Sequence, residues 1–141
     1  MMSIKNIICT AAGIFGAYVS GLFGGWNAAL STLVIFMGLD YITGVIVAGV
    51  FHNSQKSENG GLKSIIGWRG LCRKGVTLAI VLVAYRLDLL IGTSYVRDAV
   101  TIAFCVNELL SLTENAALMG VPMPDAIVRA IEVLKEDSDL L

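Results

Sequence analysis

Apolar residues dominate the first part of the chain, where residues 6–39 contain no charged side chain. This stretch is too long for one bilayer crossing, because about 20 helical residues already cover the hydrocarbon core. It is interrupted by Gly24-Gly25-Trp26-Asn27, and two glycines with an interfacial aromatic residue and an amide are typical of a turn between membrane helices. We therefore expect the chain to open with a helical hairpin in a membrane.

Further along, the apolar segments alternate with polar ones and define the expected architecture. The fold class predicted is an all-α integral membrane protein with about four transmembrane helices and a short C-terminal amphipathic helix over 125–136. A basic loop over 52–74 separates the second span from the third. Residues 1–119 form the transmembrane domain, and residues 120–141 form a cytoplasmic amphipathic helix and acidic tail. The expected spans are 7–23, 30–51, 75–91 and 99–118.

The composition agrees with a membrane domain and leaves no room for a separate soluble enzyme. Of the 141 residues 56% are hydrophobic, the mean hydropathy is +0.78, and 15% are charged, against about 25% in a typical soluble domain. Lys5 followed by an apolar run resembles a signal peptide, but a retained membrane helix is favoured. The three cysteines lack close spacing and indicate neither a disulfide framework nor a metal site.

Charge is distributed unevenly, and this sets the expected orientation. The 52–74 segment has one acidic residue, Glu58, against five basic ones, whereas acidic residues outnumber basic ones in the tail. Basic residues in short loops stay in the cytoplasm, so four spans place both termini inside, with Arg97 in an outer turn disagreeing mildly. The residues expected to determine topology are Lys56, Lys63, Arg69, Arg73 and Lys74.

Small residues recur every fourth position along the first span. Such spacing lets two helix backbones approach closely in lipid, although glycine is also generally common in membrane helices. The pattern favours a packing face, for either another helix of the same chain or a second copy. The predicted oligomer-packing row is Gly13, Ala17, Gly21 and Gly25, and a neighbouring row holds Ala12, Gly16, Ser20 and Gly24.

Several polar side chains fall within the apolar segments, where a charge costs several kcal/mol unless it is paired or faces water. One interpretation is that they line a polar path through assembled helices. An equally weighted alternative is an interhelical ion pair, such as Asp40 with Arg86, that only fixes packing. In a third, Glu108 and Glu114 lie solvated at an interface. The candidate pore-lining or intramembrane polar residues are Asp40, Arg86, Glu108, Ser111 and Asn115.

The sequence contains no pattern that indicates catalysis or a cofactor. His52 is the one histidine and lies at the end of a span, and no Ser/His/Asp set, Cys/His cluster or phosphate-binding glycine loop is present. We therefore predict that the protein is not an enzyme, that it needs no cofactor, and that it does not act on nucleic acid.

Three motifs in order resemble the toxin-secretion/phage-lysis holin family, which includes phage holins and holin-like exporters beside clostridial toxin genes. They are Asp40-x-x-Thr43-Gly44, then Gly70 with Arg73-Lys74, then Glu108-x-x-Ser111-x-x-x-Asn115 with Gly120-x-Pro122-x-Pro124. Together they cover roughly residues 40–134, while the glycine-rich first span is less clearly matched.

The resemblance implies a small phage or prophage protein of the bacterial host's cytoplasmic membrane. Such proteins accumulate harmlessly, then assemble into lesions that release an endolysin or a toxin, and they have no catalytic residues. The residues suggest a compatible mechanism, in which charges that are poorly accommodated in a monomer face one another or water in a homo-oligomer. A ring with the polar face inward would form a hole in the lipid bilayer.

Two other functions remain open at this point. A small multidrug-type transporter would use Asp40 or Glu108 as a proton-coupled cation site, but that family concentrates its carboxylate in the first span, where this chain has none. A membrane anchor would instead bind a partner protein through the 125–136 helix.

Overall fold

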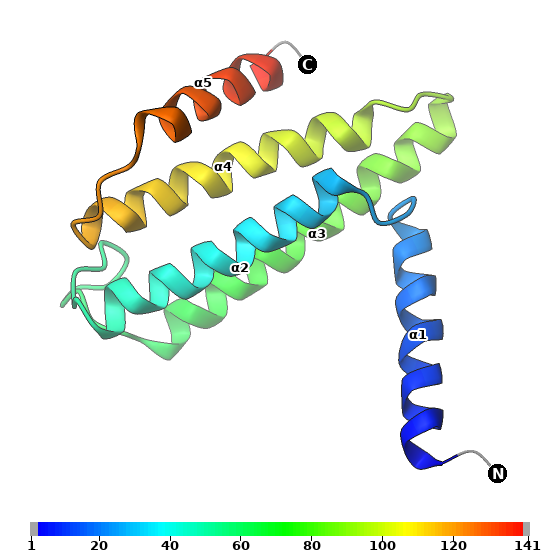
Figure 1. Cartoon of the computed structure of the whole chain (residues 1–141), viewed down its shortest axis with the longest axis horizontal. Helices are drawn as coiled ribbons and strands as arrows, with labels where there is room; N and C mark the ends of the chain where they lie inside the picture. Colours follow the sequence, from blue (N-terminus) through cyan, green and yellow to red (C-terminus); the bar gives the residue numbers. More distant parts are fainter. Residues whose placement is uncertain (1–2, 140–141) are drawn as a thin grey trace.

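The computed structural model describes residues 3–139, and every regular element within this range is an α-helix. The all-helical fold class is therefore confirmed, and so is the C-terminal helix, which extends beyond the predicted residue 136. The helices are α1 (Ile4–Leu22), α2 (Ala28–Gly49), α3 (Ser64–Ile91), α4 (Val96–Leu118) and α5 (Asp125–Asp139) (Figure 1).

The turn between α1 and α2 forms where the glycine pair predicts it. Gly24 and Gly25 have φ values of 82° and 95°, a left-handed region that favours glycine. The side chain of Asn27 then accepts a 2.9 Å hydrogen bond from the Leu30 N–H, which caps a free donor at the start of α2.

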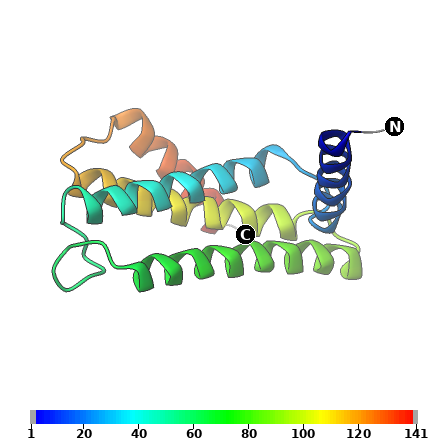
Figure 2. The ribbon, with the colours of Figure 1, turned by 90° about the horizontal axis from the view of Figure 1, so that it is seen from below.

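Helices α2, α3 and α4 run side by side and form the body of the molecule (Figures 1 and 2). Helix α2 packs mainly against α4, and α4 also contacts α3. A small apolar core joins the three helices, formed by Leu30, Leu33 and Met37 of α2, Val81 of α3 and Cys105 of α4.

Helix α1 does not form the expected hairpin with α2. It leaves the bundle beside the α3–α4 turn and points away from the other helices (Figures 1 and 2), and none of its residues is buried. The prediction was wrong because a turn fixes only where a helix ends. The packing of the two helices depends on side-chain contacts that α1 does not make.

The predicted basic loop is shorter than expected. It ends at Lys63, where α3 begins, so Arg69, Arg73 and Lys74 lie on the first turns of a long continuous helix. The expected third span at 75–91 is thus the later part of α3. The basic segment is helical because apolar residues alternate with its charges. Ile65, Ile66 and Trp68 lie between the basic residues and favour a helix.

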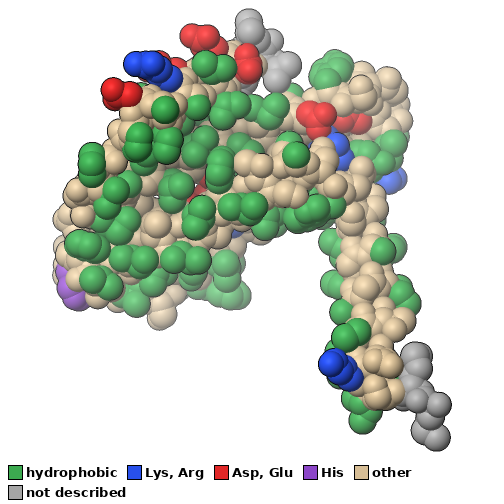
Figure 3. Space-filling view, in the orientation of Figure 1, with side chains coloured by type: hydrophobic (Ala, Val, Ile, Leu, Met, Phe, Trp, Pro, Cys, Tyr) green, Lys and Arg blue, Asp and Glu red, His purple; other side chains and the backbone are tan. Residues whose placement is uncertain are grey.

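The outer surface of the bundle is largely apolar. Ile35 and Ile42 of α2 and Val83 and Leu90 of α3 are more than half exposed, and hydrophobic side chains cover much of the face in Figure 3. By length and composition, α2 is the one described helix that is apolar enough to cross a membrane. Four transmembrane helices are therefore not confirmed.

Helix α5 folds back along α4 (Figure 1). Ile131 is buried in this contact, whereas Arg129, Glu132 and Glu136 are exposed. The helix is thus amphipathic, as its sequence predicts.

Candidate functional site: a charge cluster between three helices

One charged residue from each helix of the bundle meets at its centre. The Nζ atom of Lys74 on α3 lies 2.8 Å from Oδ2 of Asp40 on α2 and 2.7 Å from Oε2 of Glu108 on α4. The three side chains are only 10–16% exposed. Because the ammonium group bonds both carboxylates at once, it links α2 to α4 through α3.

The side-chain amide of Asn115 on α4 extends this group of charges. We call Asp40, Lys74, Glu108 and Asn115 the charge cluster. Nδ2 of Asn115 donates to Oδ1 of Asp40 at 3.0 Å and to Oγ1 of Thr43 at 2.9 Å. It also lies 3.1 Å from the Asp40 carbonyl oxygen. Both oxygens of the Asp40 carboxylate therefore have partners, one a cation and the other an amide.

The charge cluster borders a cavity of about 570 Å³. Ser111 of α4 lines it beside Asp40 and Glu108, and residues 54–57 of the loop line its other end. The cavity also contacts Arg69 and Arg73. Polar groups from three helices and the loop thus line one cavity, together with apolar side chains, in a bundle whose outer face is apolar.

The structure brings together four of the predicted polar residues, Asp40, Glu108, Ser111 and Asn115. Their role as pore-lining residues stays a prediction. The suggested partner of Asp40 was wrong, because Lys74 occupies that place. Arg86 is exposed, and no hydrogen bond or ion pair joins it to another residue in the range 3–139.

The sequence contained the information needed to find Lys74. The loop joins α2 to α3, and both helices rise equally per residue, so positions at similar distances from the loop lie opposite each other. Asp40 precedes the loop by nearly the same distance as Lys74 follows it. Arg86 lies much farther along α3, near the opposite end of the bundle.

The charges also find partners within one chain, contrary to the expectation that a monomer accommodates them poorly. Within the described residues, every buried nitrogen or oxygen atom of a side chain has a hydrogen-bond partner. The carboxylates of Asp40 and Glu108 are paired within one chain because Lys74 supplies the cation. From the sequence, Lys74 was expected in the basic loop.

A second polar group organises the opposite end of the bundle, and the sequence showed its charge near an apolar segment without predicting its role. Asp88 is buried and accepts bonds from the Thr93 hydroxyl at 2.6 Å and from the N–H groups of Val96 and Arg97, each at 2.9 Å. It thereby satisfies free donors at the start of α4. Its position shortly before a turn and a new helix could have indicated this role.

Arg97 connects this end of the bundle to the α1–α2 turn. Its guanidinium group donates to the carbonyl oxygens of Phe23 and Gly24 at 2.9 and 3.1 Å and lies 5.8 Å from the centre of the Tyr85 ring. A Cβ atom at Gly24 would overlap the Tyr85 side chain. The turn therefore needs glycine both for its backbone conformation and for this close approach.

The predicted small-residue row remains on the surface. Gly13, Ala17 and Gly21 lie on α1, and a Cβ atom added at Gly13 or Gly21 would meet no described atom within 4 Å. Gly25 lies outside the helix, in the turn. No other described helix packs against Gly13 or Gly21 within one chain, and the role of the row in oligomer packing stays a prediction.

No metal site accompanies the charge cluster among the described residues, where no three His, Cys, Asp or Glu side chains are grouped. The cluster holds its two carboxylates with an ammonium group instead. Its chemistry is therefore ion pairing between helices.

Comparisons with known proteins match most of the chain to one protein family. Residues 17–136 match the model of the bacteriophage holin family. A probable holin of Bacillus phage phi105 is 33% identical over 111 residues, which cover 78% of this chain and 76% of the phage protein. A 14.9 kDa protein in the nagH 3′ region of Clostridium perfringens is 38% identical, over 95% of this chain and 97% of its own length. No solved structure matches the chain.

Proposed function

Because the chain belongs to the bacteriophage holin family, we propose that it assembles in the bacterial cytoplasmic membrane into a timed lesion that releases an endolysin and causes lysis of the host. Release of a toxin through the same lesion is the related possibility within this proposal. The cargo passes through and is not bound. The chain itself contributes helices and polar side chains, and no catalysis.

The observation that carries the proposal is the charge cluster inside a bundle with an apolar exterior. Exposed residues such as Ile35, Val83 and Leu90 suit contact with lipid, whereas Asp40, Lys74 and Glu108 face inward. Charged side chains within membrane segments face the bundle interior or water and pair with one another. This distribution suits α2, α3 and α4 as membrane spans, with α1 as a fourth.

The proposed orientation places the loop over residues 50–63 in the cytoplasm. Lys56 and Lys63 lie in this loop, and Arg69 and Arg73 follow on the first turns of α3. Since basic residues near the ends of spans stay in the cytoplasm, four spans also leave both termini there.

The proposed mechanism has a closed and an open arrangement. In the closed one, the ion pairs of Lys74 are satisfied within each chain, so the protein accumulates without harm. In the open one, α2, α3 and α4 separate and their polar faces, with Asp40, Glu108, Ser111 and Asn115, surround water. Assembly through the exposed small residues of α1 depends steeply on concentration, which makes the event abrupt.

The test is induced expression in bacteria that also express a cytoplasmic endolysin, with membrane potential and released enzyme followed over time. We expect sudden depolarisation, and lysis only when both proteins are present. Lys74→Met should shift the time of depolarisation, while Arg86→Met, which removes an exposed charge from the same helix, should leave it unchanged. Depolarisation without release of the endolysin would indicate that the lesion is a small pore.

Two outcomes would contradict the proposal. An absence of depolarisation despite abundant protein in the membrane would favour an anchor, in particular if deletion of α5 abolished its activity. Substrate-dependent proton flux in living cells would favour a transporter that uses the cavity beside Asp40 and Glu108.

A further inference from the structure

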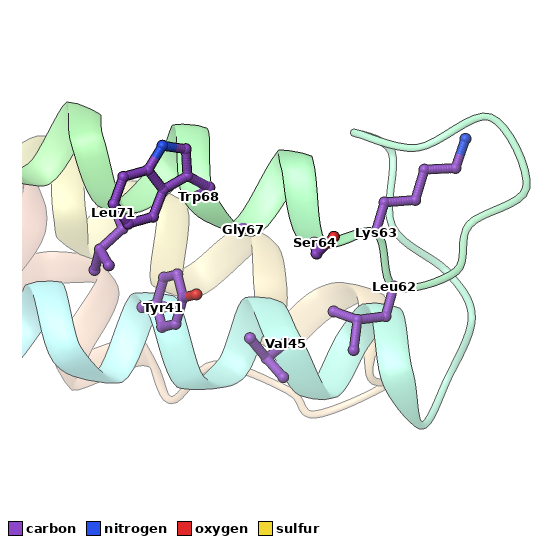
Figure 4. A pocket seen from close by; sticks show the side chains of 8 residues that line it. All are labelled: Tyr41, Val45, Leu62, Lys63, Ser64, Gly67, Trp68 and Leu71. Carbon is purple, nitrogen blue, oxygen red and sulfur yellow. The ribbon is translucent and has the colours of Figure 1, made fainter.

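A groove separates α2 from the first turns of α3, on the side of α3 away from Arg69 and Arg73. Its volume is about 490 Å³. Tyr41 and Val45 of α2 form one wall, and Trp68 and Leu71 of α3 form the other (Figure 4). The groove begins at the loop and continues along both helices toward the centre of the bundle.

A glycine on α3 gives the groove its shape. A Cβ atom at Gly67 would lie 3.3 Å from the Tyr41 hydroxyl oxygen, which is closer than ordinary contact. The absence of a side chain at this position therefore lets the Tyr41 ring fill the space between the helices without pushing them apart. Trp68 and Leu71 remain exposed at 64% and 48%, so an apolar strip is left uncovered.

The groove changes from charged to uncharged along its length, and the apolar Leu62 also lies at its loop end. Lys63 and Ser64 lie at the end beside the loop, and the Lys63 amine extends outward there, whereas Trp68 and Leu71 lie farther along α3 (Figure 4). From Lys63 to Leu71 the helix rises by about 12 Å. A molecule that fits this gradient has a polar head at the loop and an apolar chain directed into the bilayer.

The charges at the polar end favour an anion. Among the described residues, no hydrogen bond or ion pair occupies the ammonium group of Lys63. Arg69 and Arg73 line the adjoining cavity and not the groove, so Lys63 is the basic residue that lines the groove itself. The nearby carboxylates of Asp40 and Glu108 are both bonded to Lys74. The ammonium group of Lys63 at the mouth of the groove therefore remains available to a phosphate group.

We propose that this groove binds an anionic phospholipid, with the phosphate beside Lys63 and one acyl chain against Trp68 and Leu71. The inference rests on the orientation proposed above, which places Lys63 at the cytoplasmic surface. It adds a selective lipid contact beside the charge cluster, where the lipid occupies space between α2 and α3.

Fluorescence of Trp68 provides the test, because bromine atoms on a nearby acyl chain quench it. The Trp26→Phe variant leaves Trp68 as the only tryptophan, and the Trp68→Phe variant leaves Trp26, which lies before α2 at the other end of the bundle. The full-length protein is reconstituted in phosphatidylcholine vesicles that contain equal mole fractions of brominated phosphatidylglycerol or brominated phosphatidylcholine.

We expect an enrichment of the brominated anionic lipid at Trp68 of about fivefold over the zwitterionic one, from the attraction of one basic residue. Lys63→Gln should bring the two lipids close to equality. Lys56→Gln removes the same charge from the same loop outside the groove and should leave the preference intact. Trp26 should show no comparable preference.

Equal quenching of Trp68 by both lipids would overturn the lipid site and leave the proposed function standing, because quenching itself reports contact with the bilayer. Quenching of Trp68 by neither lipid would overturn the site together with the proposed insertion. A preference that Lys56→Gln and Lys63→Gln reduce equally would also overturn the site, because it would indicate general attraction to the surface.

Discussion

Helices α1 and α2 follow each other in the chain and are both rich in apolar residues, yet they have opposite surroundings. Helix α2 contributes Leu30, Leu33 and Met37 to the core and Asp40 to the charge cluster. Helix α1 has no buried residue, and the bundle holds it through the turn that follows it, where Arg97 bonds the Phe23 and Gly24 carbonyls. Similar apolar composition therefore does not decide which helix joins the bundle.

The difference lies in their polar side chains. Apolar faces alone do not drive association in lipid, because lipid tails are as apolar as leucine, whereas hydrogen bonds and close packing of small residues do. Asp40 and Thr43 give α2 specific partners on α3 and α4. Helix α1 offers small residues instead, and no described atom lies within 4 Å of a Cβ atom placed at Gly13 or Gly21.

The largest expected effect tests the polar side of this comparison. Lys74→Met leaves the carboxylates of Asp40 and Glu108 without a cation, and loss of one partner of a buried pair destabilises a protein by about 3 kcal/mol. The free energy of unfolding of the purified protein in detergent, measured by circular dichroism during a titration with SDS, should fall accordingly.

The matched control is the triple variant Asp40→Asn, Lys74→Met, Glu108→Gln, which removes all three charges and should recover most of the loss. A Lys74→Met protein as stable as Arg86→Met would show that the ion pairs do not hold the helices together.

An intermediate effect is expected at the attachment of α1. Arg97→Ala removes two hydrogen bonds to the Phe23 and Gly24 carbonyls, each worth about 1 kcal/mol or more with a charged donor, and should free α1 to change its direction. Spin labels on Cys9 of α1 and Cys72 of α3, both exposed, allow the distance between them to be measured by pulsed electron paramagnetic resonance. Cys105 is replaced by Ala in both proteins so that it is not labelled. The distribution of distances between the two labels should broaden in Arg97→Ala. An unchanged distribution would show that Arg97 does not hold α1 to the bundle.

The smallest effect on a single chain is expected at Gly13, where a side chain would meet open space. Gly13→Leu should not destabilise the monomer, because exposed substitutions away from special features change stability by about 0.5 kcal/mol or less. Cys9 lies one turn before Gly13, so disulfide cross-linking through Cys9 reports contact between two α1 helices. The cross-linked fraction should fall in Gly13→Leu. It should not fall in the control Ala11→Leu, because Ala11 lies on the other face of α1. Equal cross-linking in the two variants would show that the small-residue row does not mediate oligomer packing.

Local features of the fold could be predicted from the sequence. The glycine pair at 24–25 predicted the turn, and the spacing of Glu108, Ser111 and Asn115 predicted a polar face on one helix. These features depend on residues close together in the chain. The same reasoning grouped Asp40 with these residues as candidate lining of a polar path, because a carboxylate in an apolar segment needs a partner or water, but the ion-pair partner that it suggested, Arg86, was wrong.

What could not be predicted depends on how the helices dock. Lys74 was assigned to a loop because its neighbours are basic, although α3 begins ten residues earlier. The isolation of α1 was not predictable either, since its pattern also suits a hairpin. In both cases the deciding fact is the position of one helix relative to another.

The contact between α5 and α4 has a consequence for insertion into the membrane. Each charged residue placed at the bilayer centre costs about 3 kcal/mol on insertion scales, and α5 exposes several, among them Arg129, Glu132 and Glu136. Burial of Ile131 returns about 2 kcal/mol, which is far less. In the proposed arrangement, where α4 crosses the bilayer, α5 would lie at the water interface and would leave much of its contact with α4. A face of α4 that α5 covers in the structure would then be uncovered.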